Sequence, residues 1–221
     1  LNPFVDRSNP NFESTGNPNL HPTVGSNLSL GYSKSKKGSF NLMLGYHFFD
    51  DLIMPVSVFD PVTYITRNSY DNTGRARLFA VNVNINYPII KELNFSFNGG
   101  IAHGRVEGLV NNILVKNEGL MYNFSSSAGY RLEKGWRLNA SMYFNGPNLS
   151  IQGTSNSYLN TSFSINKDLI KDKLSFSAAA NNPFSKYRTN IRESFGPDFF
   201  QTSNFQTFYR TFNTSLNYRF G

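Results

Sequence analysis

The sequence predicts an all-β protein, an antiparallel up-and-down transmembrane β-barrel with about nine or ten strands in this chain. Three observations predict it: apolar and polar residues alternate with a period of two, tight turns alternate with long connections, and aromatic residues make up 15% of the chain. A tilted strand crosses a bilayer with roughly 9–11 residues, whereas strands of soluble proteins average about 5–6. The alternating segments have the greater length, which indicates membrane-spanning strands.

The last segment shows the alternation most clearly. Its even positions are mainly apolar and its odd positions polar: Phe208, Arg210, Phe212, Thr214, Leu216, Tyr218 and Phe220 against Tyr209, Thr211, Asn213, Ser215, Asn217 and Arg219. A period of two places one set on each face of a strand. Arg210 interrupts the apolar face. It could extend to lipid phosphate, or a local bulge could turn it inward.

Eight further segments alternate in the same way, with apolar positions within 28–32, 40–48, 79–87, 93–101, 120–130, 136–144, 159–165 and 174–180. A barrel strand turns half of its residues toward a wet lumen, so the negative mean hydropathy of −0.39 fits a membrane barrel. A soluble sandwich would not place large apolar side chains outward on so many long strands. No run of about 18 apolar residues exists, so no transmembrane helix is predicted.

The connections between strands also alternate. Short turns fall at 35–38, 88–91, 132–135 and 168–172, and long loops at 51–73, 105–118, 146–153 and 183–204. This pattern is typical of outer-membrane barrels, with turns in the periplasm and loops outside. Segment 61–68 alternates too, but it lies within a long loop, where we expect an external extension rather than a tenth strand.

Nine strands do not close a bacterial barrel, because these barrels have even strand numbers and an open edge leaves backbone groups unsatisfied in lipid. We therefore predict that the chain is part of a larger barrel. Residues 1–25 are predicted to form an extracellular loop leading into the barrel, and residues 26–221 its C-terminal part.

The basic net charge of +7 gathers at the turn side of this topology. Eleven cations there face four acids: Lys34, Lys36, Lys37, Lys91, Arg131, Lys134, Arg137, Lys167, Lys171, Lys173 and Arg219 against Glu92, Glu133, Asp168 and Asp172. A cationic collar suits the headgroups of outer-membrane lipid. Nucleic acid is not an expected partner, because no recognition motif accompanies the charge.

The sequence carries no catalytic or metal-binding motif. His21, His47 and His103 lack a second ligand at metal spacing, and Cys is absent. The pair Asp50–Asp51 at a strand end is expected to be a solvated turn rather than a calcium site. Ser, His and Asp occur without any arrangement that defines a triad. We expect no enzyme activity and no cofactor.

The long loop 183–204 is the predicted place for ligand contact, with Tyr187, Arg188 and Arg192 as the candidate residues. Arginine together with tyrosine suits anionic or sugar-like ligands, and long loops over a barrel mouth often carry recognition. The alternative, which the sequence favours, is that the aromatic residues of this loop pack on neighbouring loops and close the mouth.

Five short motifs spread over the chain resemble a known group. They are Asn2-Pro3-Phe4-Val5-Asp6-Arg7, Gly16-Asn17-Pro18-Asn19-Leu20 with Pro22, Gln152-Gly153, Asn181-Asn182-Pro183-Phe184 and Tyr218-Arg219-Phe220-Gly221. Together they resemble the C-terminal part of the barrel of TonB-dependent receptor-like outer-membrane proteins of the Bacteroides–Flavobacterium type.

The resemblance implies a barrel of about 22 strands in the outer membrane of a Gram-negative bacterium, importing a nutrient ligand. It also implies an N-terminal plug and a segment that reaches TonB in the inner membrane, and neither is in this sequence. Partners would be the upstream strands and plug of the parent protein, TonB, and in some systems a surface lipoprotein. The rival interpretation is a non-transporting barrel that serves as membrane anchor or scaffold subunit of a larger complex.

Overall fold

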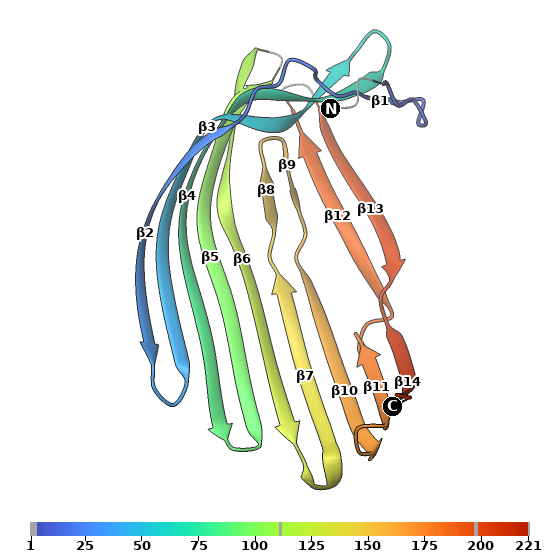
Figure 1. The fold of residues 1–221 in the computed structure, drawn as a ribbon. Coiled ribbons are helices and arrows are strands. Elements are labelled where there is room, and N and C mark those ends of the chain that lie inside the picture. The colour runs from blue at the N-terminus through green and yellow to red at the C-terminus, as the bar shows by residue number, and fades with distance from the viewer. Residues whose placement is uncertain (1–3, 111, 197–198, 221) are drawn as a thin grey trace.

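The computed structural model describes residues 4–110, 112–196 and 199–220. Nine of its strands form one curved antiparallel wall in the order β14-β11-β10-β7-β6-β5-β4-β3-β2 (Figure 1). Their bounds are β2 Val24–Ser35, β3 Ser39–Asp60, β4 Ile65–Ile90, β5 Leu93–Val110, β6 Ile113–Arg131, β7 Trp136–Asn145, β10 Tyr158–Ile170, β11 Leu174–Asn181 and β14 Thr211–Tyr218. The all-β antiparallel prediction is confirmed, although the sheet within the described residues does not close.

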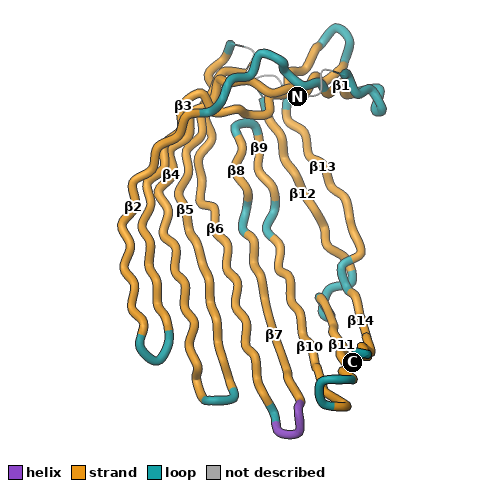
Figure 2. Tube along the Cα trace, viewed as in Figure 1, coloured by secondary structure: helices purple, strands orange, loops and turns teal. Residues whose placement is uncertain are grey.

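Smaller elements complete the fold. A second antiparallel sheet has the order β13-β12-β9-β8, with β8 at Asn148–Ser150, β9 at Gly153–Ser155, β12 at Tyr187–Phe195 and β13 at Phe200–Phe208. The short β1 (Phe12–Ser14) pairs in parallel with β4. A single 3-10 turn, η1 (Glu133–Gly135), joins β6 to β7 (Figure 2). Over the described ranges, no helix has the length and apolar character needed to cross a membrane.

The strand register gives the wall one polar and one apolar face, as predicted. A polar row crosses all nine strands through residues that lie opposite one another: Ser35, Ser39, Asn86, Ser96, Ser127, Ser141, Ser162, Asn181 and Thr211. The neighbouring apolar row crosses seven: Tyr87, Phe95, Ala128, Ala140, Phe163, Ala180 and Phe212. A slip of one residue in any strand would mix the two faces.

The apolar face of the wall is not covered by protein in the described residues. Leu30 is 70% exposed on β2, Leu120 is 56% exposed on β6 and Leu216 is 63% exposed on β14. Burying apolar area is worth about 25 cal/mol per Å². A continuous face of this kind would be costly in water, and hydrocarbon is the solvent that it suits.

The prediction that the four long connections are loops is wrong, because each of them is largely a β-hairpin. β3 and β4 continue their pairing as far as Asp60 and Ile65, and β5 and β6 as far as Val110 and Ile113. Segment 146–153 contains β8 and the start of β9, and 183–204 contains β12 and half of β13. Extended pairing satisfies backbone N–H and C=O groups that an open loop would leave to water. Segment 61–68 lies in the β3–β4 extension and is no separate wall strand, as predicted.

The last predicted strand is interrupted. β13 ends at Phe208 and β14 begins at Thr211. The N–H groups of Tyr209 and Arg210 both point to the Lys186 carbonyl oxygen, at N···O distances of 3.0 and 3.5 Å. The pairing of β14 ends at Asn181↔Thr211 and that of β13 at Tyr187↔Phe208, so residues 182–186 lie opposite only Tyr209 and Arg210. Arg210 therefore lies in a junction between the two sheets, outside both strands, and this junction interrupts the alternation.

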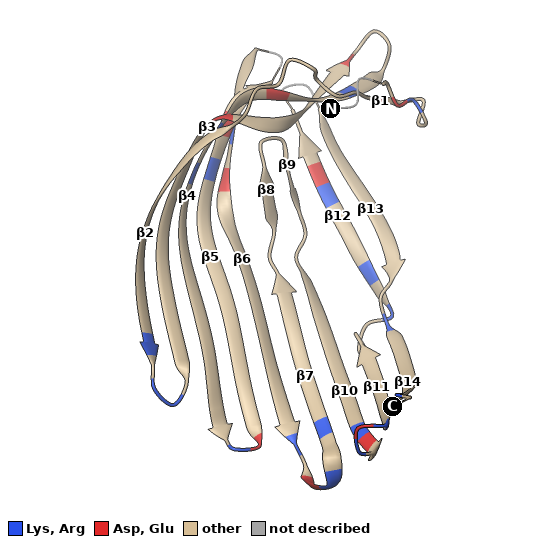
Figure 3. Cartoon of the chain, in the orientation of Figure 1, with Lys and Arg blue, Asp and Glu red and all other residues tan. Residues whose placement is uncertain are grey.

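All four short turns lie at one end of the wall, which we call the turn-side rim: the turns after β2, β4, β6 and β10. Figure 3 shows Lys and Arg gathered along this rim. One ion pair there joins Arg137 to Asp168 at 2.8 Å, and the Lys167 ammonium lies 4.6 Å from the centre of the Trp136 ring. The β extensions lie at the opposite end.

Candidate ligand-binding cleft

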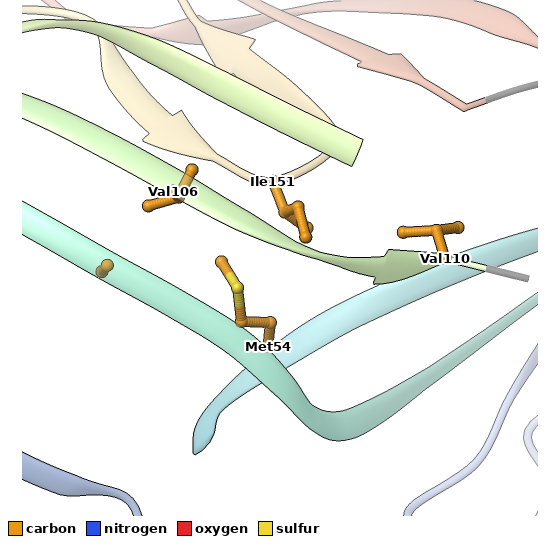
Figure 4. Packing of buried hydrophobic residues seen from close by; sticks show 5 residues of the cluster. Met54, Val106, Val110 and Ile151 are labelled. Carbon is orange, nitrogen blue, oxygen red and sulfur yellow. The ribbon is translucent and has the colours of Figure 1, made fainter. Parts of the chain in front are cut away.

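The extensions form a second region, which we call the cap: β1, the far halves of β3 to β6, and the sheet of β8, β9, β12 and β13. The cap contains the only buried hydrophobic cluster of the described residues. Its members are Met54, Ala76, Val106, Val110 and Ile151 (Figure 4). Ile151, at the tip of the β8–β9 hairpin, is 1% exposed. The cluster therefore anchors this hairpin onto β3, β4 and β5.

Gln152, next to Ile151, connects the hairpin to β3. Its side-chain oxygen accepts the Ser57 N–H at 2.9 Å, and its side-chain nitrogen donates to the Ser57 carbonyl at 3.0 Å. The amide thus replaces a neighbouring peptide group, since it offers one acceptor and one donor. Gln152 is buried, and its own carbonyl accepts the Phe195 N–H at 2.8 Å.

Gly153 allows β12 to pack closely against β9. A Cβ at this position would collide with the Glu193 carbonyl oxygen of β12. The Gln152-Gly153 motif therefore has two local roles: the amide holds β3, and the missing side chain lets β9 pair with β12.

Other side-chain amides bridge places where strands separate. The Asn117 side chain donates to the Ser150 carbonyl at 2.7 Å, which links β6 to β8. The Asn156 oxygen accepts the Ile191 N–H at 2.7 Å, and its nitrogen donates to the Thr189 carbonyl at 3.0 Å. These hydrogen bonds connect the wall to the second sheet across the gap between them.

Asn182, from another of the resemblance motifs, has the same role at the junction of wall and cap. Its φ is +49°, a left-handed conformation that Asn tolerates better than most residues. Its side-chain oxygen accepts the Thr161 N–H at 2.8 Å and its nitrogen donates to the Tyr209 carbonyl at 3.1 Å. It therefore stabilises the junction between β13 and β14.

Between β1 with the β3–β4 extension on one side and the second sheet on the other lies a cleft of about 880 Å³. Hydroxyl and amide side chains make up most of its lining: Ser14, Thr15, Ser57, Thr66, Asn68, Ser69, Asn148, Ser150, Gln152, Thr154, Ser155, Ser194, Gln201 and Ser203. Aromatic rings of Phe4, Phe12, Tyr70 and Phe199 also line it. The volume lies within the ~300–1,000 Å³ range of ligand sites.

Few charges border the cleft. They are Asp6, Arg192 and Glu193. The backbone N–H of Ser8, which donates to the Asp6 carboxylate at 2.9 Å, holds the pKa of Asp6 below its ordinary value. The carboxylate is therefore charged at neutral pH. With two acids and one base, the cleft suits a polar ligand with little net charge rather than a polyanion.

The three predicted ligand residues all lie on β12 but have different surroundings. Arg192 is exposed and lines the cleft. Tyr187 lies on the opposite face of the strand, with its ring centre 5.0 Å from that of Phe208. Arg188 is half-buried, and its guanidinium lies 3.5 Å from the centre of the Tyr158 ring. The structure thus brings Arg192 to the cleft and places the other two against aromatic neighbours.

Sequence reasoning missed the other side of the cleft. That side of the cleft is formed by β1 and the β3–β4 extension, which lie in segments that the sequence predicts to be loops. Gln152 was noted only as a motif residue. Its position between Ile151 and Gly153 carries no signal for the partner, Ser57, which is 95 residues away.

His21 and Asp51 are connected through their backbones, because the Asn72 side-chain nitrogen donates to both carbonyl oxygens at 2.9 Å. His47 is on the polar face of β3, and His103 is on the apolar face of β5, opposite Phe79. The Asp50 carboxylate accepts from Arg77 at 2.9 Å. Among the described residues, no group of three or more His, Asp or Glu side chains could hold a metal ion.

A family model described as an outer membrane protein beta-barrel family matches residues 1–218. The chain belongs to this outer membrane protein beta-barrel family. No curated protein and no solved structure gave a match. As a member of the family, the protein is a barrel protein of the outer membrane of Gram-negative bacteria, so the apolar face of its wall contacts lipid hydrocarbon.

Proposed function

We propose that this chain is the C-terminal part of the barrel of a TonB-dependent receptor-like transporter that imports a nutrient ligand across the outer membrane. The observation that carries the proposal is the polar cleft of about 880 Å³ in the cap. It lies at one end of a wall whose inner face is lined by serine and asparagine rows. A ligand bound there would be held at the entrance of a polar route.

The sequence motifs support the same proposal. The resemblance to TonB-dependent receptor-like proteins extends from Phe4 to Phe220, and two of its motifs, around Gln152 and Asn182, stabilise the cap and its junction with the wall. The unpaired outer edges of β2 and β14 leave positions where upstream strands of the parent protein would pair. The ligand is inferred to be polar and close to neutral, because hydroxyl and amide residues far outnumber charged residues in the cleft lining.

Uptake by cells that carry the full-length parent protein tests this proposal. The probes are a panel of labelled oligosaccharides, peptides and ferric chelates, measured with and without a protonophore. We expect uptake of at least one probe to depend on the protein and to stop when the proton gradient is dissipated. A scaffold or anchor would leave uptake of every probe unchanged on deletion and would alter only the assembly of its partner complex.

A matched pair of variants tests whether the ligand binds in the cleft. Ser203 lines the cleft, whereas the neighbouring Thr202 on β13 faces away from it. We expect Ser203→Trp to reduce uptake strongly by filling the space, and Thr202→Trp to leave it unchanged. Equal uptake in both variants would show that the cleft is not part of the transport route.

A further inference from the structure

The apolar face of the wall carries a groove on its lipid side. The groove has a volume of about 610 Å³ and extends from the start of β5 across β6, β7, β10, β11 and β14. Its floor consists of Ala128 and Ala140 on one side of Phe163, and of Ala178 and Ala180 between Phe163 and Phe212. Large side chains around small ones create a depression that a flat apolar face would lack, and nearly all the exposed lining area is apolar.

A cation lies beyond the turn-side end of this groove. Ile165 lines the groove, and Lys167 follows two residues later on the same face of β10. At about 3.3 Å per residue, the two positions are separated by roughly 7 Å along the strand. The Lys167 ammonium lies 4.6 Å from the centre of the Trp136 ring. A Trp–Lys pair of this kind is typical of the level of lipid headgroups.

Lys167 forms no ion pair with the adjacent Asp168. Asp168 follows it in sequence but lies on the opposite face of the strand, where it accepts from Arg137 at 2.8 Å. The adjacent turn adds Lys171 and Lys173 against Asp172. The end of the groove at the turn-side rim is therefore cationic and complements a phosphate group.

We propose that this groove is a binding site for one phospholipid of the membrane leaflet at the turn-side rim. An acyl chain would lie in the groove over the alanine floor, and the anionic headgroup would lie against Lys167 and Trp136. The proposal does not depend on transport, because a scaffold barrel would offer the same face to lipid.

Photocross-linking of the full-length protein in nanodiscs tests the proposal. The probes are phosphatidylglycerol and phosphatidylcholine with the same photoreactive acyl chain. We expect phosphatidylglycerol to label peptides of β7, β10 and β11 above the rest of the wall. Lys167→Gln should lower the preference for phosphatidylglycerol over phosphatidylcholine by about fivefold, the effect of one lysine near an anionic surface. Lys34→Gln, at the same rim on β2, should leave that preference unchanged.

A second pair of variants separates the groove from the general lipid face. Ala140→Trp fills the groove and should abolish the excess labelling by both lipids, whereas Val81→Trp on β4 should not change it. Uniform labelling around the wall, or excess labelling that survives Ala140→Trp, would overturn the proposal. So would loss of a co-purifying protein from Ala140→Trp with unchanged lipid labelling, since the occupant would then be a protein segment. If Ala140→Trp fails to fold, as judged by heat-modifiable gel mobility, an unchanged lipid preference in Lys167→Gln would by itself overturn the proposal.

Discussion

The wall and the cap are built from the same alternating strands, yet they are stabilised in different ways. The wall turns its apolar face outward, where Leu30 and Leu216 are 70% and 63% exposed, and it has no buried core among the described residues. The cap buries Met54, Val110 and Ile151 against one another, as a water-soluble domain does. A period of two therefore specifies strands, whereas the solvent on each side decides which face is buried.

The two regions also satisfy their polar groups differently. Wall strands pair with neighbours in continuous register, so backbone groups bond to backbone groups. In the cap the strands separate, and side-chain amides of Gln152, Asn117 and Asn156 bond to the backbone across the gaps. A substitution should therefore act through lipid contact in the wall and through packing or an unsatisfied amide partner in the cap.

The largest effect is expected in the cap core. Ile151→Ala should lower the free energy of opening the β8–β9 hairpin by about 2–5 kcal/mol, because it leaves a cavity among Met54, Val106 and Val110. Hydrogen exchange of peptides covering 146–158 would measure this change. The control is Val62→Ala, at a cap position that is 85% exposed, where exchange should not change. Equal effects of the two variants would contradict the assignment of the cluster as a core.

The wall should respond to a charge on one face only. Val83 lies in the middle of the apolar face of β4, and Asn84 is on the polar face. Val83→Arg should cost about 2–4 kcal/mol because the guanidinium enters hydrocarbon, whereas Asn84→Arg should cost much less. Refolding of the two full-length variants into lipid vesicles under denaturant would measure the difference. Equal tolerance at both positions would remove the distinction between the faces.

A smaller effect is expected when the connection between β8–β9 and β3 is cut. Gln152→Ala should destabilise the cap by about 1–3 kcal/mol, because the partly buried Ser57 N–H and C=O lose their hydrogen-bond partners. Faster exchange of peptides covering 52–60 would show it. Gln206→Ala is the control, since the exposed Gln206 amide donates only to the Thr189 hydroxyl, at 3.3 Å. Unchanged exchange in Gln152→Ala would mean that water replaces the amide without cost.

The smallest effect is expected at the turn-side rim. The Arg137–Asp168 pair is close, at 2.8 Å, but its side chains are 46% and 40% exposed. Asp168→Asn should cost at most about 1 kcal/mol, and the cost should fall in high salt because exposed ion pairs are screened. Urea midpoints at two salt concentrations would measure it. A larger, salt-independent loss would show that the pair is structurally important to the wall.

The sequence predicts the strands of the wall and the direction in which their side chains face, but it does not predict the strands of the cap. Alternation alone predicted the facing of Val83 and Asn84, and the short turns, such as 88–91, predicted which strands are neighbours. The sequence predicts loops for the cap strands because Pro55 and Gly153 within them, and Pro61 in the turn between β3 and β4, suggest breaks. Pairing across the extensions nevertheless satisfies the backbone, and that is a long-range property which no local pattern shows.

The candidate site was predicted only in part for the same reason. Arg192 was chosen for its charge in an aromatic segment and does line the cleft. Part of the lining comes from neighbouring residues of β12 and β13, and the other side comes from β1, β3, β4 and the β8–β9 hairpin, which is held to β3 and the cap core through Gln152 and Ile151. Residues such as Ser57 and Ser155 are common in this sequence, so nothing local distinguishes those that face the cleft.

Spin-label accessibility along β4 tests most directly whether the apolar face contacts lipid. The chain has no cysteine, so single-cysteine variants of this chain at each position from 79 to 85 can be labelled specifically in liposomes. We predict high collision rates with oxygen at 79, 81, 83 and 85, and high rates with a water-soluble nickel complex at 80, 82 and 84. The opposite phase, or no alternation, would contradict the account.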